Sequence, residues 1–219
     1  MNRFFRALVC LSAALMLCAC NPEADPSASQ DPSRQDPNPV ETTLRCVEIS
    51  RFSGQFVEDG SDRQVSDVAA ILVANNTGKF VDLATITYQV GDRTATFKVT
   101  GLPAGQQAWV LEQNAMQLKP SDEMVFDDCV ISYHPDPVLT SRDLAVSRSG
   151  HALTLTNQTG ETLVNVCVYY KNQLDDGSLF GGITYQMIFD TLEPGQSLTL
   201  ARDHFMDNSV IVRFSYQLK

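Results

Sequence analysis

Apolar and polar residues alternate with a period of two over several short stretches of the chain. In residues 84–88, Ala, Ile and Tyr alternate with Thr, and in residues 166–170, Val, Val and Tyr alternate with Cys and Tyr. Turn sequences such as Asn-Thr-Gly and Pro-Gly separate these stretches. A period of two in residues rich in Val, Ile, Thr and Tyr predicts antiparallel strands with one buried face. Because no window keeps a helical period for more than two turns, we predict an all-β fold.

The chain also contains an internal repeat. The segment Asn-Asn-Thr-Gly at 75–78 returns as Asn-Gln-Thr-Gly at 157–160. Three further matches keep the same order along the chain: residues 49–51 with 146–148, 99–106 with 189–196, and 131–133 with 214–216. Such duplication predicts two tandem modules, residues 44–135 and 138–219, each a small two-sheet antiparallel β-sandwich of about six strands. The short join at Pro135-Asp136-Pro137 favours a stiff pair, because two prolines limit bending there.

Residues 1–19 are typical of a signal peptide. They begin with the basic residues Arg3 and Arg6 and continue with an apolar run that is too short to span a bilayer. The sequence Leu17-Cys18-Ala19-Cys20 at its end resembles the lipobox of bacterial lipoproteins. That resemblance implies that the Cys20 thiol carries a diacylglycerol, which would hold the protein at a membrane surface. The alternative is an ordinary secretory signal that is cut nearby and releases a soluble protein.

Residues 20–43 have the composition of a tether. Beyond the acylated cysteine they contain five prolines, repeated Asp-Pro pairs and almost no apolar side chains. Such a segment cannot bury enough surface to offset the entropy lost on ordering, so we predict a disordered, extended linker.

Charge limits the choice of partner. The chain has a formal net charge of −10, and removal of residues 1–19 would take away Arg3 and Arg6 and make it more acidic. A surface of this sign repels phosphate backbones, so we expect no nucleic-acid partner.

The module pattern has a resemblance of its own. A Cys-anchored tether precedes two modules that carry Asn-x-Thr-Gly, a Tyr-containing strand and a Leu-x-x-Gly-Gln turn. This arrangement resembles the immunoglobulin-like modules of bacterial surface lipoproteins, over residues 44–219. The Cys-Trp-Cys spacing of antibody domains is missing. The resemblance implies a role in display or binding and identifies no ligand.

The two copies differ mainly in two insertions. The first copy is longer between Gly54 and Ala70, where the insertion contains four carboxylates: Glu58, Asp59, Asp62 and Asp67. Clustered oxygen ligands suit a hard cation such as calcium, so a metal-stabilised loop is one hypothesis and a solvated acidic loop is the other. The second copy is longer at 172–182, where Leu179 and Phe180 could form a partner-binding loop. Alternatively these two residues fold back over the sheet edge or start the next strand.

Neither the cysteines nor any catalytic motif identifies a function in this sequence. Beyond Cys20 the chain contains Cys46, Cys129 and Cys167. A bridge between Cys46 and Cys129 would need a β-bulge, so bridged and unbridged forms both stay open. No P-loop, Gly-x-Ser-x-Gly elbow or His-Glu-x-x-His motif occurs, so we expect no enzyme and no cofactor.

These observations favour a non-enzymatic, lipid-anchored protein of the bacterial cell envelope, facing outside the cytoplasm. It would contact the membrane through lipid on Cys20 and display two modules to an unknown envelope protein or glycan, or act as a structural spacer. The alternative is an accessory lipoprotein that binds a small ligand or a metal. A chelator-dependent shift in melting temperature would favour the alternative.

Overall fold

The computed structural model describes residues 19–20, 43–61, 63–134 and 142–219. Within these residues the chain forms strands, turns and loops without a helix, so the predicted all-β class is confirmed. The strands are β1 (Ala19–Cys20), β2 (Leu44–Gln55), β3 (Gln64–Asn75), β4 (Val81–Val90), β5 (Arg93–Leu102), β6 (Gln107–Leu111), β7 (Val125–Tyr133), β8 (Leu144–Ser149), β9 (Ala152–Asn157), β10 (Leu163–Gln173), β11 (Leu179–Leu192), β12 (Ser197–Ala201) and β13 (Ser209–Leu218). In this part of the chain, no helix is available to cross a membrane.

Three predictions concern residues outside this description. The signal peptide and the tether fall on residues 1–18 and 21–42, apart from the short strand β1. The proline-containing join falls on residues 135–141.

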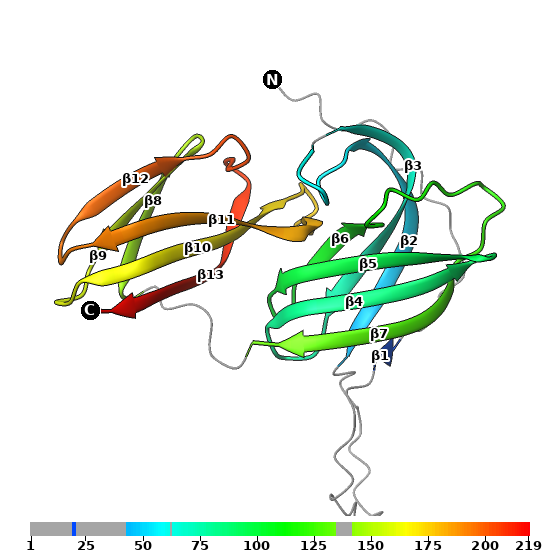
Figure 1. The fold of residues 1–219 in the computed structure, drawn as a ribbon, viewed down its shortest axis with the longest axis horizontal. Helices are drawn as coiled ribbons and strands as arrows, with labels where there is room; N and C mark the ends of the chain where they lie inside the picture. Colours follow the sequence, from blue (N-terminus) through cyan, green and yellow to red (C-terminus); the bar gives the residue numbers. More distant parts are fainter. Residues whose placement is uncertain (1–18, 21–42, 62, 135–141) are drawn as a thin grey trace, which may run out of the picture.

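The strands form two halves that lie side by side in Figure 1. We call residues 43–134 the first half and residues 142–219 the second half. One sheet of seven strands has the order β1-β2-β3-β6-β11-β10-β13, and two three-stranded sheets have the orders β5-β4-β7 and β12-β9-β8. The seven-stranded sheet therefore contains strands from both halves.

Both halves use the same order of strand pairing. In the first half, β2 pairs with β3, β3 with β6, β4 with β5, and β4 with β7. In the second half, β8 pairs with β9, β9 with β12, β10 with β11, and β10 with β13. Each half thus has six strands that pair in the same pattern, as a duplicated module would.

A buried asparagine closes the same turn in each half. The Asn75 side chain donates to the carbonyls of Lys79 and Leu102 at 2.9 and 2.8 Å, and its Oδ1 accepts from the Thr77 hydroxyl at 2.7 Å. In the second half the Asn157 side chain donates to the carbonyls of Glu161 and Leu192 at 2.8 and 2.9 Å, and its Oδ1 accepts from the Thr159 hydroxyl at 2.7 Å. The repeated Asn-x-Thr-Gly sequence therefore encodes one repeated set of hydrogen bonds.

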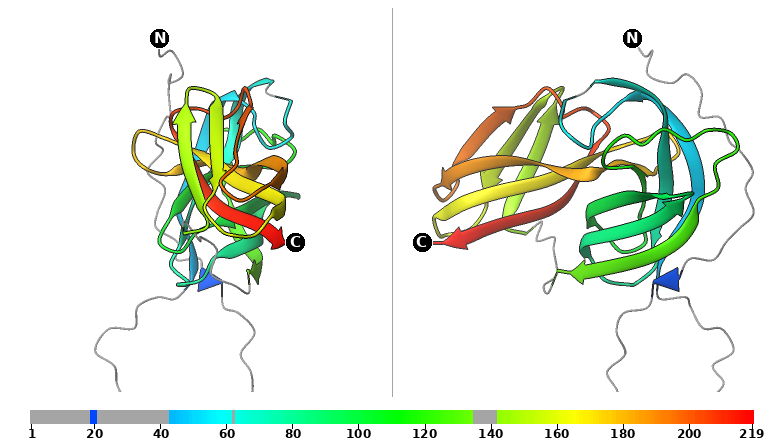
Figure 2. Two further views of the ribbon diagram at one scale, coloured as in Figure 1. Left: turned by 90° about the vertical axis from the view of Figure 1, so that its left-hand side faces the viewer. Right: turned by 45° about the vertical axis from the view of Figure 1, so that its right-hand side comes forward.

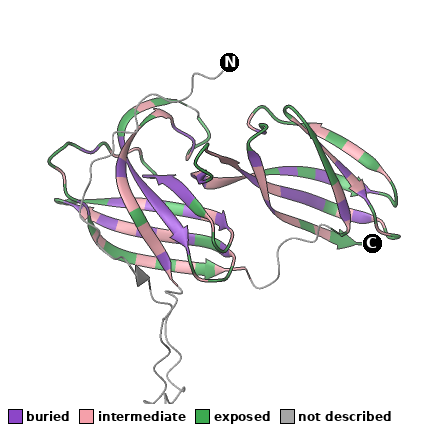
Figure 3. Ribbon diagram, turned by 180° about the vertical axis from the view of Figure 1, so that it is seen from behind, coloured by how far each residue is buried: buried purple, intermediate pink, exposed green. Residues whose placement is uncertain are grey.

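The alternating residues that predict strands do bury one face. Ala84, Ile86 and Tyr88 are buried on β4, whereas the threonines between them are half-buried. On β10 the corresponding buried residues are Val166, Val168 and Tyr170. Figure 3 shows buried residues along the strands of both halves. One apolar cluster lies mainly in the first half and also contains Leu179 and Val212 of the second, and another lies within the second half.

The halves are joined by strand pairing. The beginning of β11 leaves the second half and pairs in parallel with β6, Leu179 opposite Ala108 and Phe180 opposite Trp109. The views in Figure 2 show β10 and β11 reaching from one half to the other. A sheet that runs through both halves couples them more firmly than a flexible linker would.

Candidate functional site at the junction of the two halves

The two insertions that distinguish the copies meet each other. We call this contact the junction: it consists of the loop 56–63, the segment 174–183 and the strands that they cover. A third apolar cluster fills it, with the buried residues Phe56, Val57, Val68, Ala70, Leu72, Trp109 and Leu111, and the half-buried residues Phe52, Val65, Ala115, Leu174, Phe180 and Ile183. The insertions therefore cover the outer face of β3 and β6.

The loop of the first half has its own local order. The Phe56 N–H donates to the Arg63 carbonyl at 2.8 Å, and the Arg63 guanidinium lies 4.7 Å from the centre of the Phe56 ring. The Asp59 carboxylate accepts from the Ser61 hydroxyl at 2.6 Å and from the Ser61 N–H at 2.9 Å, and these two bonds and Arg63 hold the pKa of Asp59 below its usual range. This closed loop places Glu58 so that its carboxylate faces the second half.

The segment of the second half packs against the first. Leu179 is fully buried in the apolar cluster of the first half. Phe180 is half-buried, and its ring centre lies 5.4 Å from that of Phe52. The structure thus shows the second of the two arrangements considered for these residues: they start β11 at the edge of β6. Binding of an outside partner by Leu179 and Phe180 stays a prediction.

Glu58 connects the halves through backbone N–H groups. Its carboxylate accepts from the Leu111 N–H at 2.9 Å in the first half, and from the Gly182 N–H at 2.8 and 3.0 Å in the second. Burial raises the pKa of Glu58, and the hydrogen bonds from Gly182 and Leu111 and the charge of Lys171 oppose this shift. The carboxylate is therefore held by the junction rather than exposed to solvent.

Lys171 is a fully buried lysine on β10. Its ammonium donates to the carbonyls of Gly181 and Gly182 at 3.0 Å each, and to that of Ile183 at 2.7 Å. Burial lowers the pKa of Lys171 to about 7, whereas the charge of Glu58 acts in the opposite direction. A buried charge is costly unless it is hydrogen-bonded, and here three carbonyls use all three ammonium hydrogens.

Two glycines make this close approach possible. A Cβ at Gly182 would lie 1.9 Å from the Lys98 carbonyl oxygen, which is backbone and cannot turn away. Gly181 has φ of +85°, which favours glycine, and a Cβ there would lie 2.8 Å from a methyl carbon of Val57. The pair of glycines in β11 is therefore needed for contact between the halves.

Polar contacts extend the junction along β5 and β4. The Thr100 hydroxyl donates to the Gly182 carbonyl at 3.0 Å, and the Thr184 hydroxyl donates to the Thr100 carbonyl at 2.8 Å. Arg213 of the second half lies 3.5 Å from Asp82 of the first and 4.0 Å above the Tyr169 ring. The junction therefore combines strand pairing, apolar packing and charged groups.

The residues of the junction hold the two halves together and do not form a reactive site. An amine with a pKa near 7 can act as a nucleophile when a substrate reaches it. Lys171, however, is fully enclosed, and its hydrogens point to backbone carbonyls. The arrangement connects the halves and offers the amine no approach path.

The carboxylates predicted for a metal-stabilised loop do not share a site. Glu58 faces backbone N–H groups, Asp59 faces Ser61 and Arg63, and Asp67 lies 3.5 Å from Arg51. Asp62 is outside the described residues. Among the described side chains, no group of three or more His, Cys, Asp or Glu residues could hold a metal ion.

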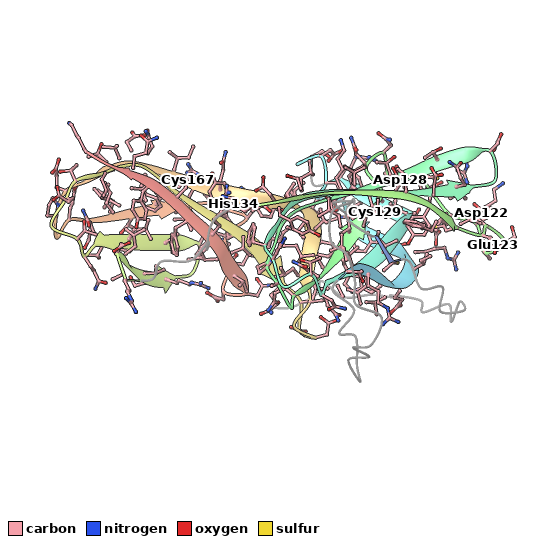
Figure 4. All side chains as sticks on the ribbon, turned by 90° about the horizontal axis from the view of Figure 1, so that it is seen from below. Asp122, Glu123, Asp128, Cys129, His134 and Cys167 are labelled. Carbon is pink, nitrogen blue, oxygen red and sulfur yellow. The ribbon has the colours of Figure 1, made fainter. Side chains whose placement is uncertain are left out.

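The cysteines are arranged differently from the bridge considered above. Cys129 is disulfide-bonded, whereas Cys46 and Cys167 carry thiols, so no Cys46–Cys129 bridge is present. A bulge between Cys46 and Glu48 does turn the Cys46 side chain towards the apolar cluster of the first half. Figure 4 shows Cys129 on the first half and Cys167 on the second. The backbone of Cys20 pairs with Leu44, and its side chain is outside the description.

Neither a protein-family model nor a curated protein matches the chain at a significant level. The features of the chain that bear on function are therefore the residues of the junction and the N-terminal sequence.

Replacing Leu179 by alanine is expected to lower the free energy of unfolding by about 2–5 kcal/mol, because a fully buried side chain would leave a cavity between the halves. Chemical denaturation measures the change. Val130→Ala is the matched control, since Val130 is 64% exposed and its loss should cost less than about 0.5 kcal/mol. Equal effects of the two substitutions would contradict the placement of Leu179.

Proposed function

We propose that this protein is a non-enzymatic, lipid-anchored protein of the bacterial cell envelope. It holds two immunoglobulin-like β-sandwich modules, residues 44–135 and 138–219, as one rigid unit outside the cytoplasm. The unit serves structural spacing or display to an envelope protein or glycan. The observation that carries this proposal is the junction, where strand pairing between β6 and β11 and the buried Glu58 and Lys171 tie the halves together.

Two tandem sandwiches are supported by the repeated details of the halves. Six strands pair in the same order in each, and Asn75 and Asn157 make equivalent hydrogen bonds. The two copies of the module contact each other through the insertions in which they differ. Such a contact makes a stiff two-module unit.

The outer face of the second half favours a unit that ends after two modules. In the first half, Leu72 pairs with Trp109 on the face that the insertions cover. The equivalent pair in the second half is Thr154 and Thr199, whose hydroxyls lie 2.8 Å apart and are exposed. A polar outer face suits the terminal module of a stack, because it needs no further module to cover it.

Rigidity can be measured by nuclear magnetic relaxation of backbone amides in the whole chain. We expect amides of β4 in the first half and of β9 in the second to report one common tumbling time, because the junction prevents independent rotation. Two shorter times, one for each half, would refute the rigid unit.

The proposed lipid anchor can be tested by replacing Cys20. Cys20→Ala should abolish acylation and release the protein from the membrane fraction, because no other thiol stands at the lipobox position. Cys18→Ala is the matched control and should stay acylated and membrane-bound. Mass spectrometry of the N-terminal peptide with membrane fractionation measures both. Acylation that persists in the Cys20→Ala variant would refute the anchor.

The state of Cys129 offers a second check on the anchor. Lipid would convert the Cys20 sulfur to a thioether, and Cys46 and Cys167 carry thiols. In a lipidated chain cleaved before Cys20, a disulfide at Cys129 would thus require a sulfur from a second molecule. Non-reducing mass measurement of the acylated protein should show Cys129 as a thiol or in an intermolecular bond.

A further inference from the structure

β12 is the second half's equivalent of β6, but its outer edge is open. β6 lies between β3 and β11, whereas β12 is the last strand of its sheet and, in the part of the chain that the structure describes, pairs with β9 alone. β11 covers the edge of β6, and Ala108 and Val110 there are fully buried. Their equivalents on β12, Leu198 and Leu200, are half-buried. Figure 2 shows β12 at the end of the second half that is turned away from the first half, so its edge is accessible to another strand.

β12 also lacks the features that protect the other edge strands. Charged side chains, prolines and bulges commonly keep an edge strand from pairing with another chain. Apart from the two-residue strand β1, the other described edge strands, β5, β7, β8 and β13, each contain a charged residue, namely Lys98, Asp128, Arg148 and Arg213. β12 consists of Ser-Leu-Thr-Leu-Ala and pairs with β9 without a register shift. It is therefore an uncharged and regular edge.

Alternate residues of β12 direct their backbone groups to this open edge. The Gln196 carbonyl accepts from the Asn157 N–H at 3.0 Å. The Arg202 N–H donates to the His151 carbonyl at 3.1 Å. The even-numbered residues therefore face β9, and successive residues of an antiparallel strand direct their N–H and C=O groups to opposite sides. The residues that face the open edge are Ser197, Thr199 and Ala201.

The edge groups of β12 correspond to groups that are bound in the first half. Leu111, the equivalent of Ala201, donates its outward N–H to Glu58. The Ala201 carbonyl accepts from the Arg202 guanidinium at 3.0 Å, and the Arg202 side chain is exposed. Because an exposed side chain can turn away when another strand arrives, this bond does not close the edge.

β12 is complementary to a second copy of itself. Antiparallel pairing of two β12 strands about Thr199 places Leu198 opposite Leu200 of the second copy. It also places Ser197 opposite the second copy's Ala201. The two Thr199 residues then face each other, and both direct their backbone groups to the shared edge, as a hydrogen-bonded pair requires. A self-complementary patch of this kind is what a two-fold symmetric dimer needs.

We propose that β12 is a dimerisation edge, at which two copies of this chain pair antiparallel about Thr199. The pairing joins the β12-β9-β8 sheets of the two copies into one sheet and covers the half-buried Leu198 and Leu200. The net charge of −10 opposes association, and the contact uses an edge without charged residues. The polar outer face around Thr154 stays exposed in such a dimer. This inference goes beyond the proposed spacer and does not depend on the lipid anchor.

Sedimentation velocity of residues 20–219 carrying Cys20→Ala measures the association. Reducing conditions are used, so that neither lipid nor a disulfide contributes to it. We expect a reversible dimer with a dissociation constant on the order of 1–100 µM. A chain that stays monomeric up to about 1 mM overturns the proposal, whether or not the native protein is acylated.

Thr199→Lys tests whether β12 is the contact. The substitution places two like charges opposite each other at the centre of the pair, and lysine is common on exposed edge strands of folded proteins. We expect the dissociation constant to rise by about tenfold or more. Thr154→Lys is the matched control, because it adds the same charge to the neighbouring strand β9 on the same outer face, and it should leave the dimer unchanged. A dimer that survives Thr199→Lys, or one that only Thr154→Lys disrupts, overturns pairing through the edge.

Cysteine cross-linking tests the register and needs no charged variant. Opposite residues of a hydrogen-bonded antiparallel pair have Cα atoms about 5.5 Å apart, which a disulfide can bridge. Thr199→Cys should therefore form a covalent dimer on oxidation, detected by mass measurement without reductant. Ser197→Cys is the matched control, because it keeps the same native cysteines and places the two new thiols more than about 10 Å apart. Failure of Thr199→Cys to bridge, or equal bridging by Ser197→Cys, overturns pairing about Thr199.

Discussion

Lys171→Met is expected to lower the free energy of unfolding by about 3–5 kcal/mol. Removal of the ammonium leaves the buried charge of Glu58 without its counter-charge and leaves three carbonyls without their donor. Chemical denaturation near neutral pH measures the loss. Lys98→Met is the matched control, because the Lys98 side chain is exposed and its removal should cost less than about 0.5 kcal/mol.

The double variant Lys171→Met/Glu58→Gln separates the charge effect from lost packing. A glutamine oxygen can still accept from Gly182 or Leu111, and no unpaired charge remains. We therefore expect the double variant to lose less stability than the sum of the single variants, with a coupling of about 0.5–3 kcal/mol. Additive losses would show that Lys171 acts through packing alone.

The strands could be predicted from the sequence because they depend on the local alternation of apolar and polar residues. Alternation over residues 84–88 and 166–170 depends only on which face of a strand is buried, and the residues predicted to face inward are buried: Ala84, Ile86, Tyr88, Val166, Val168 and Tyr170. Cys167, which the alternation places on the other face, is buried as well. The repeat at Asn75 and Asn157 was visible for the same reason, since its hydrogen bonds close a turn within a few residues and one neighbouring strand end. Local patterns of this kind need no knowledge of how the modules pack.

The junction could not be derived in the same way. Both insertions stand out in the sequence, but the contact of Glu58 with Gly182 joins residues far apart along the chain. Lys171 shares the strand face of Tyr169, which the alternation predicts to be outward, and it is buried because the first half covers that face. The glycine pair at 181–182 inside an apolar stretch was the one local signal, since glycine in a strand often marks close approach of another backbone.

The bulge at Cys46 is a smaller example of the same limit. Strict alternation predicts that Val47 and Ile49 share the buried face of β2. The bulge shifts this register: Cys46 and Ile49 pack against the apolar cluster, and Val47 is exposed. One extra residue in a strand reverses the face of every residue beyond it. No residue near Cys46 in the sequence predicts this bulge.

Gly182→Ala is expected to destabilise the protein by about 3 kcal/mol or more, because overpacking at a rigid contact forces the backbone to move. The added Cβ would lie 1.9 Å from the Lys98 carbonyl oxygen, far inside contact distance. Relief requires β11 to move away from β5, and the same movement weakens the bonds from Gly182 to Glu58 and Thr100. The steric clash and the weakened hydrogen bonds therefore both lower the stability of the Gly182→Ala variant.

Two measurements distinguish loss of the junction from general unfolding. Chemical denaturation gives the stability, and amide relaxation should now show separate tumbling of the two halves, with the buried hydrogen bonds of Asn75 and Asn157 still protected from exchange. Gly160→Ala is the matched control, because a Cβ there meets nothing within 4 Å, and we expect unchanged tumbling. If Gly182→Ala keeps wild-type stability and a single tumbling time, the close approach of β11 to β5 is not what holds the halves together.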